Sequence, residues 1–323
     1  MFYGAVRLSG APAPVNERNR AMKVFVVGGT GFVGTALTGA LVREGHTVTL
    51  MARHPKPNAI PNPQVQFVAG DGTRAGKWQD VVAQHDWLIN LAGVTVFRRW
   101  NDAYKKLLYD SRILTTRHLV EAIPDDRGSV RCLINTSGAG FYGFRGDEEL
   151  TEDAPPGNDF LSRLAQEWEA EAFKAQSKGV RVTVTRFGIV LGKHGGALQQ
   201  MAMPFKFFLG GPVGNGKQWI PWIHIEDLCR AMIFVAENED MSGPVNFCAP
   251  EPVRNRDLAK AIGKALHRPS FFPAPGFMIK LVLGEFGSVI LEGQRAVPAA
   301  LLKHGFVFKH PRIEDAVRDL LGG

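Results

Sequence analysis

A glycine-rich stretch near the amino terminus, Gly28-Gly29-Thr30-Gly31-Phe32-Val33-Gly34, constrains the fold more than any other part of the sequence. An apolar, β-branched segment (24–27) precedes it, as expected of a buried parallel strand. After it, small and apolar residues recur at helical spacing from Ala36 to Leu41. The stretch therefore lies between a strand and the start of a helix. At such a place a dinucleotide pyrophosphate can lie against free backbone N–H groups and the positive end of the helix dipole.

The three spaced glycines have separate expected roles. Gly28 permits the tight turn, Gly31 lets the backbone approach a phosphate, and Gly34 lets the helix pack closely on the strand. Glycines at this spacing also occur in ordinary loops, but the flanking strand and helix favour a nucleotide site. The predicted cofactor-binding residues of this turn are Gly28, Thr30, Gly31, Phe32, Val33 and Gly34.

The sequence continues as an alternation of strand-like and helix-like segments. The expected strands are 47–51, 64–68, 87–90, 132–137 and 181–185, and the longest expected helices are 104–122 and 159–177. This alternation predicts right-handed βαβ units and a parallel sheet. We expect an α/β fold with at least six strands, helices on both faces, and the strand before Gly28 in the sheet interior.

The end of the second expected strand indicates which nicotinamide cofactor fits. An acidic residue there binds the ribose 2′-OH of NAD, whereas an arginine accommodates the 2′-phosphate of NADP. No Asp or Glu occurs between Glu44 and Asp71, and the strand ends in Arg53, with Lys56 nearby. The planar guanidinium of Arg53 suits a phosphate, although a solvated basic loop would look the same. We therefore predict NADP(H) as the cofactor.

Two further segments are expected at the cofactor. Asp71 follows the third strand, where its carboxylate either holds the adenine amino group or caps the turn. Leu91, Ala92 and Gly93 follow the fourth strand, and their small side chains let the backbone approach the cofactor.

Charge and cysteine content narrow the class of protein. The net charge is +7, yet no run of Lys and Arg with interleaved aromatic residues occurs, so we expect no nucleic-acid partner. An anionic cofactor and an anionic substrate account for part of the excess. No apolar run is long enough for a membrane span, and we expect no membrane partner. The three cysteines lie far apart, which predicts neither a metal site nor disulfides and is typical of a cytoplasmic protein.

Several motifs in a fixed order extend the interpretation beyond the glycine turn. They are 91–93 followed by Arg99-Trp100 and Ser111-Arg112, then 137–143, 195–198, 216–219, 222–227 and 293–295. Through them the chain from Lys23 onward resembles the extended short-chain dehydrogenases/reductases. More narrowly, it resembles the atypical epimerase-like (NAD-dependent epimerase/dehydratase) family with a distinctive C-terminal domain, sometimes labelled cell-division-inhibitor-like.

The resemblance implies a Rossmann-type, doubly wound parallel sheet that binds the nucleotide and a smaller C-terminal lobe that closes over the substrate. The NADP-binding domain would comprise residues 22–192 and 217–248, the lobe 193–216 and 249–323, and residues 1–21 a disordered extension. It further implies that the backbone of Gly188, Ile189 and Val190 faces the nicotinamide. His224 looks catalytic but suits a structural role at a helix start better.

The chain departs from the wider superfamily at the catalytic pair. Standard members use a Tyr with a Lys four residues later, and none of the four tyrosines here has that Lys. The helix that should carry the pair has apolar residues instead, with Trp168 at the expected Lys position. Where nucleotide-sugar enzymes carry an Arg, this chain has Ile220, which argues against a nucleotide-sugar diphosphate. Arg112 could meet a substrate carboxylate or phosphate, or form a salt bridge within the helix layer.

The remaining candidates for chemistry are Ser137 and Tyr142. Ser137 ends the fifth strand, at the edge where ligands bind in open α/β sheets, and Tyr142 is the only phenol nearby in sequence. Support of a glycine-rich turn is the alternative role for both.

We predict an NADP(H)-binding oxidoreductase acting on a small carbonyl or hydroxyl compound, with Ser137 orienting the substrate oxygen. One alternative is a non-catalytic NADPH-binding sensor or partner-docking protein, which the missing Tyr/Lys pair favours. The other is a sugar epimerase, which would need two acid/base groups that the sequence does not supply. The oligomeric state is open, a homodimer included.

Overall fold

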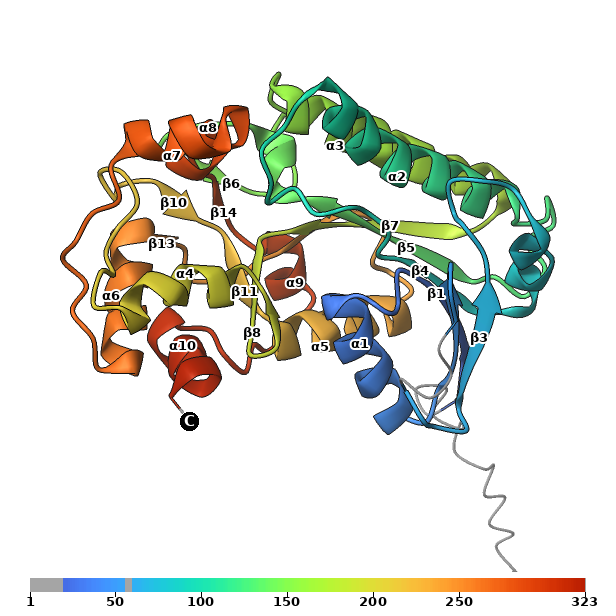
Figure 1. The fold of residues 1–323 in the computed structure, drawn as a ribbon. Coiled ribbons are helices and arrows are strands. Elements are labelled where there is room, and N and C mark those ends of the chain that lie inside the picture. Colours follow the sequence, from blue (N-terminus) through green and yellow to red (C-terminus); the bar gives the residue numbers. More distant parts are fainter. Residues whose placement is uncertain (1–19, 56–59, 323) are drawn as a thin grey trace, which may run out of the picture.

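A seven-stranded parallel sheet forms the centre of the molecule in the computed structural model, which describes residues 20–55 and 60–322 (Figure 1). Its strands are β1 (Lys23–Val27), β2 (Thr47–Ala52), β3 (Val65–Ala69), β4 (Trp87–Asn90), β5 (Cys132–Gly138), β7 (Arg181–Phe187) and β12 (Gly243–Phe247). They run in the order β12–β7–β5–β4–β1–β2–β3, and all neighbours are parallel. The predicted parallel sheet, with the strand before Gly28 in its interior, is therefore confirmed.

The direction in which strands are added reverses at β1. The chain first builds β2 and β3 on one side of β1, then crosses to build β4, β5 and β7 on the other. In the resulting register Val27, the last residue of β1, is paired with Met51 on one side and Asn90 on the other. Ligands of open α/β sheets bind at the carboxyl ends of the strands beside such a reversal, which is where the glycine turn begins.

Helices cover both faces of the sheet. Helices α1 (Phe32–Arg43) and α5 (Ile225–Glu237) lie on one face, while α2 (Asp102–Glu121), α3 (Phe160–Phe173) and the 3-10 helix η3 (Lys77–Gln84) lie on the other (Figure 1). Two further 3-10 helices are η4 (Ala139–Tyr142) and η5 (Lys174–Lys178). The apolar faces of these helices pack against the strands and form one hydrophobic core on each face of the sheet. Leu37 and Met232 belong to the core on one face, and Leu119 belongs to the core on the other. The interior strands β1 and β4 are buried on both faces and are near-continuous apolar runs.

Two local features differ from the sequence-based expectation. The predicted helix over 159–177 divides into α3, capped by the Asp159 side chain on the Ser162 N–H, and the separate 3-10 helix η5. The strand β12 was not predicted, because it is short and begins with Gly243-Pro244. A proline lacks the N–H that a central strand would need, and β12 accordingly lies at the sheet edge.

A smaller lobe lies beside the carboxyl edge of the sheet (Figure 1). Its helices are α4 (Ala197–Lys206), α6 (Asn255–Leu266), α7 (Gly276–Leu283), α8 (Glu285–Leu291) and α10 (Ile313–Leu321). Its short strands are β8 (Ile189–Gly192), β9 (Gly195–Gly196), β10 (Trp219–Ile220), β11 (Trp222–His224) and β13 (Val253–Arg254), and β6 (Glu149–Leu150) pairs with β14 (Arg295–Ala296). Helices α6 and α10 pack together around a core that includes Leu198, Leu258 and Val317.

The carboxyl-terminal part of the chain also returns to the sheet. Helix α9 (Ala299–Lys303) packs against β12, and Leu301, Phe306 and Phe308 join the core that α1 and α5 form on the sheet. The carboxyl-terminal part of the chain therefore packs on the central sheet as well as on the lobe. Residues 1–19 lie outside the described part of the chain, and with them all of the expected extension over 1–21 except its last two residues. No helix within that described part has the length and apolar character needed to cross a membrane.

Candidate functional site

The glycine turn joins β1 to α1 in a conformation that its glycines make possible. Gly28 has φ +79°, and a Cβ there would lie 2.9 Å from the backbone C and O of Leu91, beyond the neighbouring strand β4. A Cβ on Gly34 would lie 2.5 Å from the Gly28 carbonyl oxygen. The Gly31 N–H donates to that same oxygen at 3.1 Å. The turn can therefore lie this close to Leu91 and to the start of α1 only because both positions are glycine.

The start of α1 has the properties of an anion site. Gly31 is its N-cap, no side chain caps the helix, and the first turn has no acidic residue. The first N–H groups of a helix have no partner within it and carry the positive end of the helix dipole. These residues thus provide donors for a pyrophosphate, and no side chain competes with it.

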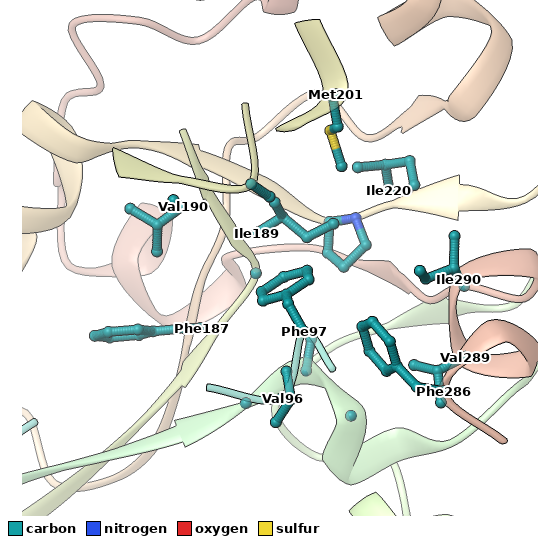
Figure 2. Close-up of a pocket in the computed structure, with 18 of the residues that line it drawn as sticks. Val96, Phe97, Phe187, Ile189, Val190, Met201, Ile220, Phe286, Val289 and Ile290 are labelled. Atoms are coloured by element: carbon teal, nitrogen blue, oxygen red, sulfur yellow. The ribbon is translucent and has the colours of Figure 1, made fainter. Parts of the chain in front are cut away.

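A cavity of about 680 Å³ opens between the carboxyl edge of the sheet and the smaller lobe. It brings together ten of the residues predicted from sequence: Phe32, Val33, Leu91, Ala92, Gly93, Arg112, Ser137, Gly188, Ile189 and Val190. Figure 2 shows several apolar side chains that line it, with Phe187 and Val190 at one end and Phe286 and Ile290 at the other. One continuous space therefore connects the nucleotide edge with the lobe.

Arg53 and Asp71 lie beyond this cavity at adjacent strand ends. Arg53 follows Ala52, which pairs with Ala69 of β3, and its side chain is exposed. Asp71 accepts hydrogen bonds from the Thr73 N–H at 3.0 Å and the Thr73 hydroxyl at 2.8 Å, which is the turn-capping role. Partial burial alone would raise the pKa of Asp71, but these bonds and the nearby charges of Arg53 and Arg74 lower it. Lys56 lies outside the described residues.

Ser137 belongs to a buried polar network that the sequence did not reveal. Its hydroxyl donates to Glu169 Oε1 at 2.6 Å. Glu169, on α3, forms a two-point ion pair with Arg186, at 2.9 Å from Nε and 2.8 Å from Nη2. Burial by itself disfavours the guanidinium charge, but Glu169 raises the pKa of Arg186 above its ordinary value. Ser137 is thus held by a fixed carboxylate while it lines the cavity.

Tyr142 lies on the far side of that network and does not line the cavity. Its side chain is fully buried, its hydroxyl donates to Asn246 Oδ1 at 2.6 Å, and it accepts from Arg186 Nη1 at 3.0 Å. Burial raises the pKa of Tyr142 to about 12. This position matches the supporting role rather than that of a proton donor at the cavity.

The Arg112 side chain also makes its contacts within the protein. Its guanidinium donates to the carbonyl oxygens of Leu108 and Val94, both at 3.1 Å, and lies 5.1 Å from the ring centre of Trp168. Burial lowers its pKa to about 10, so the side chain stays charged near neutrality. Among the described residues its hydrogen-bond partners are backbone carbonyl oxygens and not the carboxylate of a salt bridge.

The face of α3 that lines the cavity is apolar where the superfamily carries its catalytic pair. It presents Leu161, Leu164, Ala165 and Trp168. The Trp168 Nε1–H donates to Thr116 Oγ1 at 2.8 Å, and an indole cannot act as the base that a lysine would provide. His224 caps α5 by accepting from the Glu226 N–H, in line with the structural role that we favoured.

Two groups of site residues escaped the sequence reasoning. The Glu169–Arg186 pair was missed, although an arginine near the end of an expected buried strand signals a carboxylate partner. The second group comes from α8, whose residues 286, 289 and 290 line the cavity. Nothing in that short apolar segment distinguishes a cavity wall from an ordinary core.

The sequence is similar to that of known proteins along most of its length. Residues 24–248 match the model of the NAD dependent epimerase/dehydratase family, and residues 274–320 match a domain of unknown function, DUF1731. The chain belongs to the NAD dependent epimerase/dehydratase family. The resemblance inferred from the motifs is thereby confirmed.

Three individual proteins illustrate the relationship. Epimerase family protein YfhF of Bacillus subtilis is 37% identical over 301 residues, which are 93% of this chain and 98% of YfhF. The crystal structure of human epimerase family protein SDR39U1 (isoform 2) with NADPH superposes with a TM-score of 0.81 at 34% identity, covering 93% of this chain and 99% of that one. A nucleoside-diphosphate sugar epimerase from Corynebacterium glutamicum gives a TM-score of 0.77 at 31% identity, covering 94% of this chain and 59% of that one.

Proposed function

We propose that the protein binds NADPH and acts as an oxidoreductase on a small carbonyl or hydroxyl compound. One observation supports this most strongly. The uncapped start of α1 and the hydroxyl of Ser137 belong to one site, because Phe32 of α1 and Ser137 line the same cavity. That cavity continues under the smaller lobe, where a second molecule fits. The human relative crystallised with NADPH agrees with this choice of cofactor.

The residues present fit the cofactor. The backbone N–H groups at the start of α1 suit the pyrophosphate, and Arg53 suits the 2′-phosphate. A Cβ on Gly28 would lie 2.9 Å from the Leu91 backbone, so the glycine lets the turn pack against the segment that follows β4. The backbone of 188–190 lines the cavity beside Phe187, on the side expected for the nicotinamide. When bound, the nicotinamide supplies or accepts a hydride.

Ser137 is the residue we assign to the substrate oxygen. Because its own proton is donated to Glu169, its oxygen lone pairs are available to accept a hydrogen bond from a substrate hydroxyl. Rotation of the hydroxyl would let it donate to a carbonyl instead. Glu169 positions Ser137 and is itself fixed by Arg186. The arrangement orients an oxygen but does not supply the Tyr/Lys proton donor of standard members.

A second candidate function is that of a non-catalytic NADPH-binding sensor. The apolar face of α3, with Leu164 and Trp168 at the cavity, favours it because no acid or base replaces the missing pair there. An epimerase is less well supported. It needs two acid/base groups, and the charged side chains among the described cavity-lining residues are Arg112 and Glu292.

Measurement of binding and turnover together tests the proposal. NADPH should bind, and its oxidation at 340 nm should accelerate with at least one member of a panel of aldehydes and ketones. Ser137→Ala should keep NADPH affinity while lowering turnover by about tenfold or more. NADPH binding with no turnover across the panel would favour the sensor. No NADPH binding at all would refute both functions.

A further inference from the structure

We propose that the part of the cavity under the smaller lobe binds the apolar body of a carbonyl compound, such as an aliphatic or aromatic ketone, rather than a nucleotide sugar. The inference rests on the proposed function and names its substrate class. It stands on the lining of the cavity, on the position of its charges, and on the place of its hydroxyl groups.

One end of the cavity is walled by apolar side chains from several distant segments. We call it the apolar wall, and it consists of Val96, Phe97, Met201, Ile220, Phe286, Val289 and Ile290. In Figure 2 these side chains project into one common space from the 94–100 loop, α4, β10 and α8. Burial of hydrocarbon against such a surface is favourable by about 0.8 kcal/mol for each methylene group.

The apolar wall is packed and preformed. Phe286 is 3% exposed, and its ring lies 5.6 Å from that of Phe97 and 5.4 Å from that of Trp100. The Gln218 side chain donates to the carbonyl oxygen of Ile290 at 3.2 Å, which joins α8 to the chain before β10. Ile220, where nucleotide-sugar enzymes carry an arginine, is 6% exposed and faces the same space. A ligand would therefore meet a fixed apolar surface.

Away from the start of α1, the charged side chains around the cavity do not suit the diphosphate of a nucleotide sugar. Arg112 is held against the α2 side by the carbonyls of Val94 and Leu108, next to Gly93. Glu292 lies beside the apolar wall, is exposed, and would repel an anion. No other charged side chain lines the cavity in the part of the chain that the structure describes. Diphosphates are bound by several cations or oriented N–H groups, which the wall lacks.

The end of the cavity at β5 offers a hydroxyl to a ligand oxygen. Ser137 and Thr136 both line it, at the end of β5. The Thr136 Oγ1 atom is buried and has no hydrogen-bond partner among the described residues. The Ser137 hydroxyl at one end and hydrocarbon at the other fit a ligand with one carbonyl and an apolar body.

Affinity for a homologous ketone series tests the inference. The protein is loaded with NADP⁺, so that ketone reduction cannot occur, and 2-butanone, 2-hexanone and 2-octanone are titrated by calorimetry. The dissociation constant should fall about fourfold for each added methylene until the wall is covered, which corresponds to about 0.8 kcal/mol. UDP-glucose should not displace 2-octanone.

Two variants on one helix provide the matched comparison. Met201→Gln places an amide in the apolar wall, whereas Met203→Gln changes a side chain of α4 that is 53% exposed and does not line the cavity. Met201→Gln should weaken 2-octanone binding about five- to tenfold. Met203→Gln should leave it unchanged within twofold, and both variants should bind NADP⁺ like the parent.

The outcomes separate this inference from the proposed function. A dissociation constant that does not depend on chain length, or displacement of 2-octanone by UDP-glucose, would overturn the inference while leaving NADPH binding intact. If NADP⁺ fails to bind, the proposed function fails, and the same series titrated into the protein alone still decides the wall. In that titration, an affinity that rises with ketone chain length supports the apolar wall, and an affinity independent of chain length overturns it. Ketones that bind but are never reduced support the wall and refute the oxidoreductase.

Discussion

The substitution Glu169→Gln should destabilise the protein strongly, because it removes one partner of a buried ion pair. The side chains of Glu169 and Arg186 are 6% and 5% exposed. Arg186 would keep the Tyr142 hydroxyl, the Glu152 carbonyl oxygen and the ring of Phe141, 3.5 Å from its guanidinium carbon. None of these groups carries the negative charge that offsets the desolvation of a buried guanidinium.

The expected size follows from that loss. Breaking a buried pair by removing one partner typically reduces stability by about 3–5 kcal/mol. Urea denaturation followed by circular dichroism gives the free energy of unfolding for the parent and the variant. The double variant Glu169→Gln/Arg186→Met, which removes both charges, should recover part of the loss.

An exposed pair is the control. Asp110→Asn removes the partner of Lys106, whose side chain is 74% exposed, and should change stability by less than about 1 kcal/mol. If Glu169→Gln loses no more stability than this control, the buried pair does not stabilise the protein as we describe.

Two further predictions concern titration and thiol chemistry. Burial lowers the pKa of three histidines below the ordinary value of 6.5: His46, His85 and His224. The unfolded chain then takes up protons first, so stability present above about pH 6.5 is lost as the pH falls below it, by up to about 1.4 kcal/mol per pH unit for each histidine. Urea midpoints at pH 7.5, 6.5 and 5.5 check this, and equal midpoints would contradict it. Burial also raises the pKa of the Cys132 thiol to about 11 and that of Cys229 to about 12, and Cys248 is equally enclosed. A thiol reagent such as DTNB at pH 8 should therefore label no cysteine of the folded protein within minutes and all three after denaturation, and rapid native labelling would show that the core opens.

The sequence predicted those features of the fold that depend on local pattern. The glycine turn, the parallel strands and the α/β alternation follow from spacing and from apolar runs, and the structure confirms them. Strand β12 could not be predicted, because Gly243-Pro244 opposes strand formation and only the vacant edge beside β7 accommodates it.

Some parts of the candidate site could likewise be predicted from the sequence, and others could not. Segments 91–93 and 188–190 were each expected at the cofactor, the second through the family resemblance, and both line the cavity. Contacts between distant segments were not expected. Glu169 reaches Ser137 and Arg186 only after α3 packs on the sheet, and residues of α8 reach the cavity only after the lobe folds back. Such meetings depend on tertiary packing, which one sequence does not encode locally.

Titration calorimetry with NADPH and NADH on the parent protein and on Arg53→Ala decides whether this chain is built for NADP. Arg53 directly follows β2, is exposed, and has no carboxylate near it in sequence before Asp71. A hydrogen bond to a charged group contributes about 1.5–3 kcal/mol, so Arg53→Ala should weaken NADPH about ten- to a hundredfold. NADH, which lacks the 2′-phosphate, should bind more weakly than NADPH to the parent and equally to both proteins. Equal affinity of the parent for the two cofactors, or equal weakening of both by Arg53→Ala, would contradict the assignment.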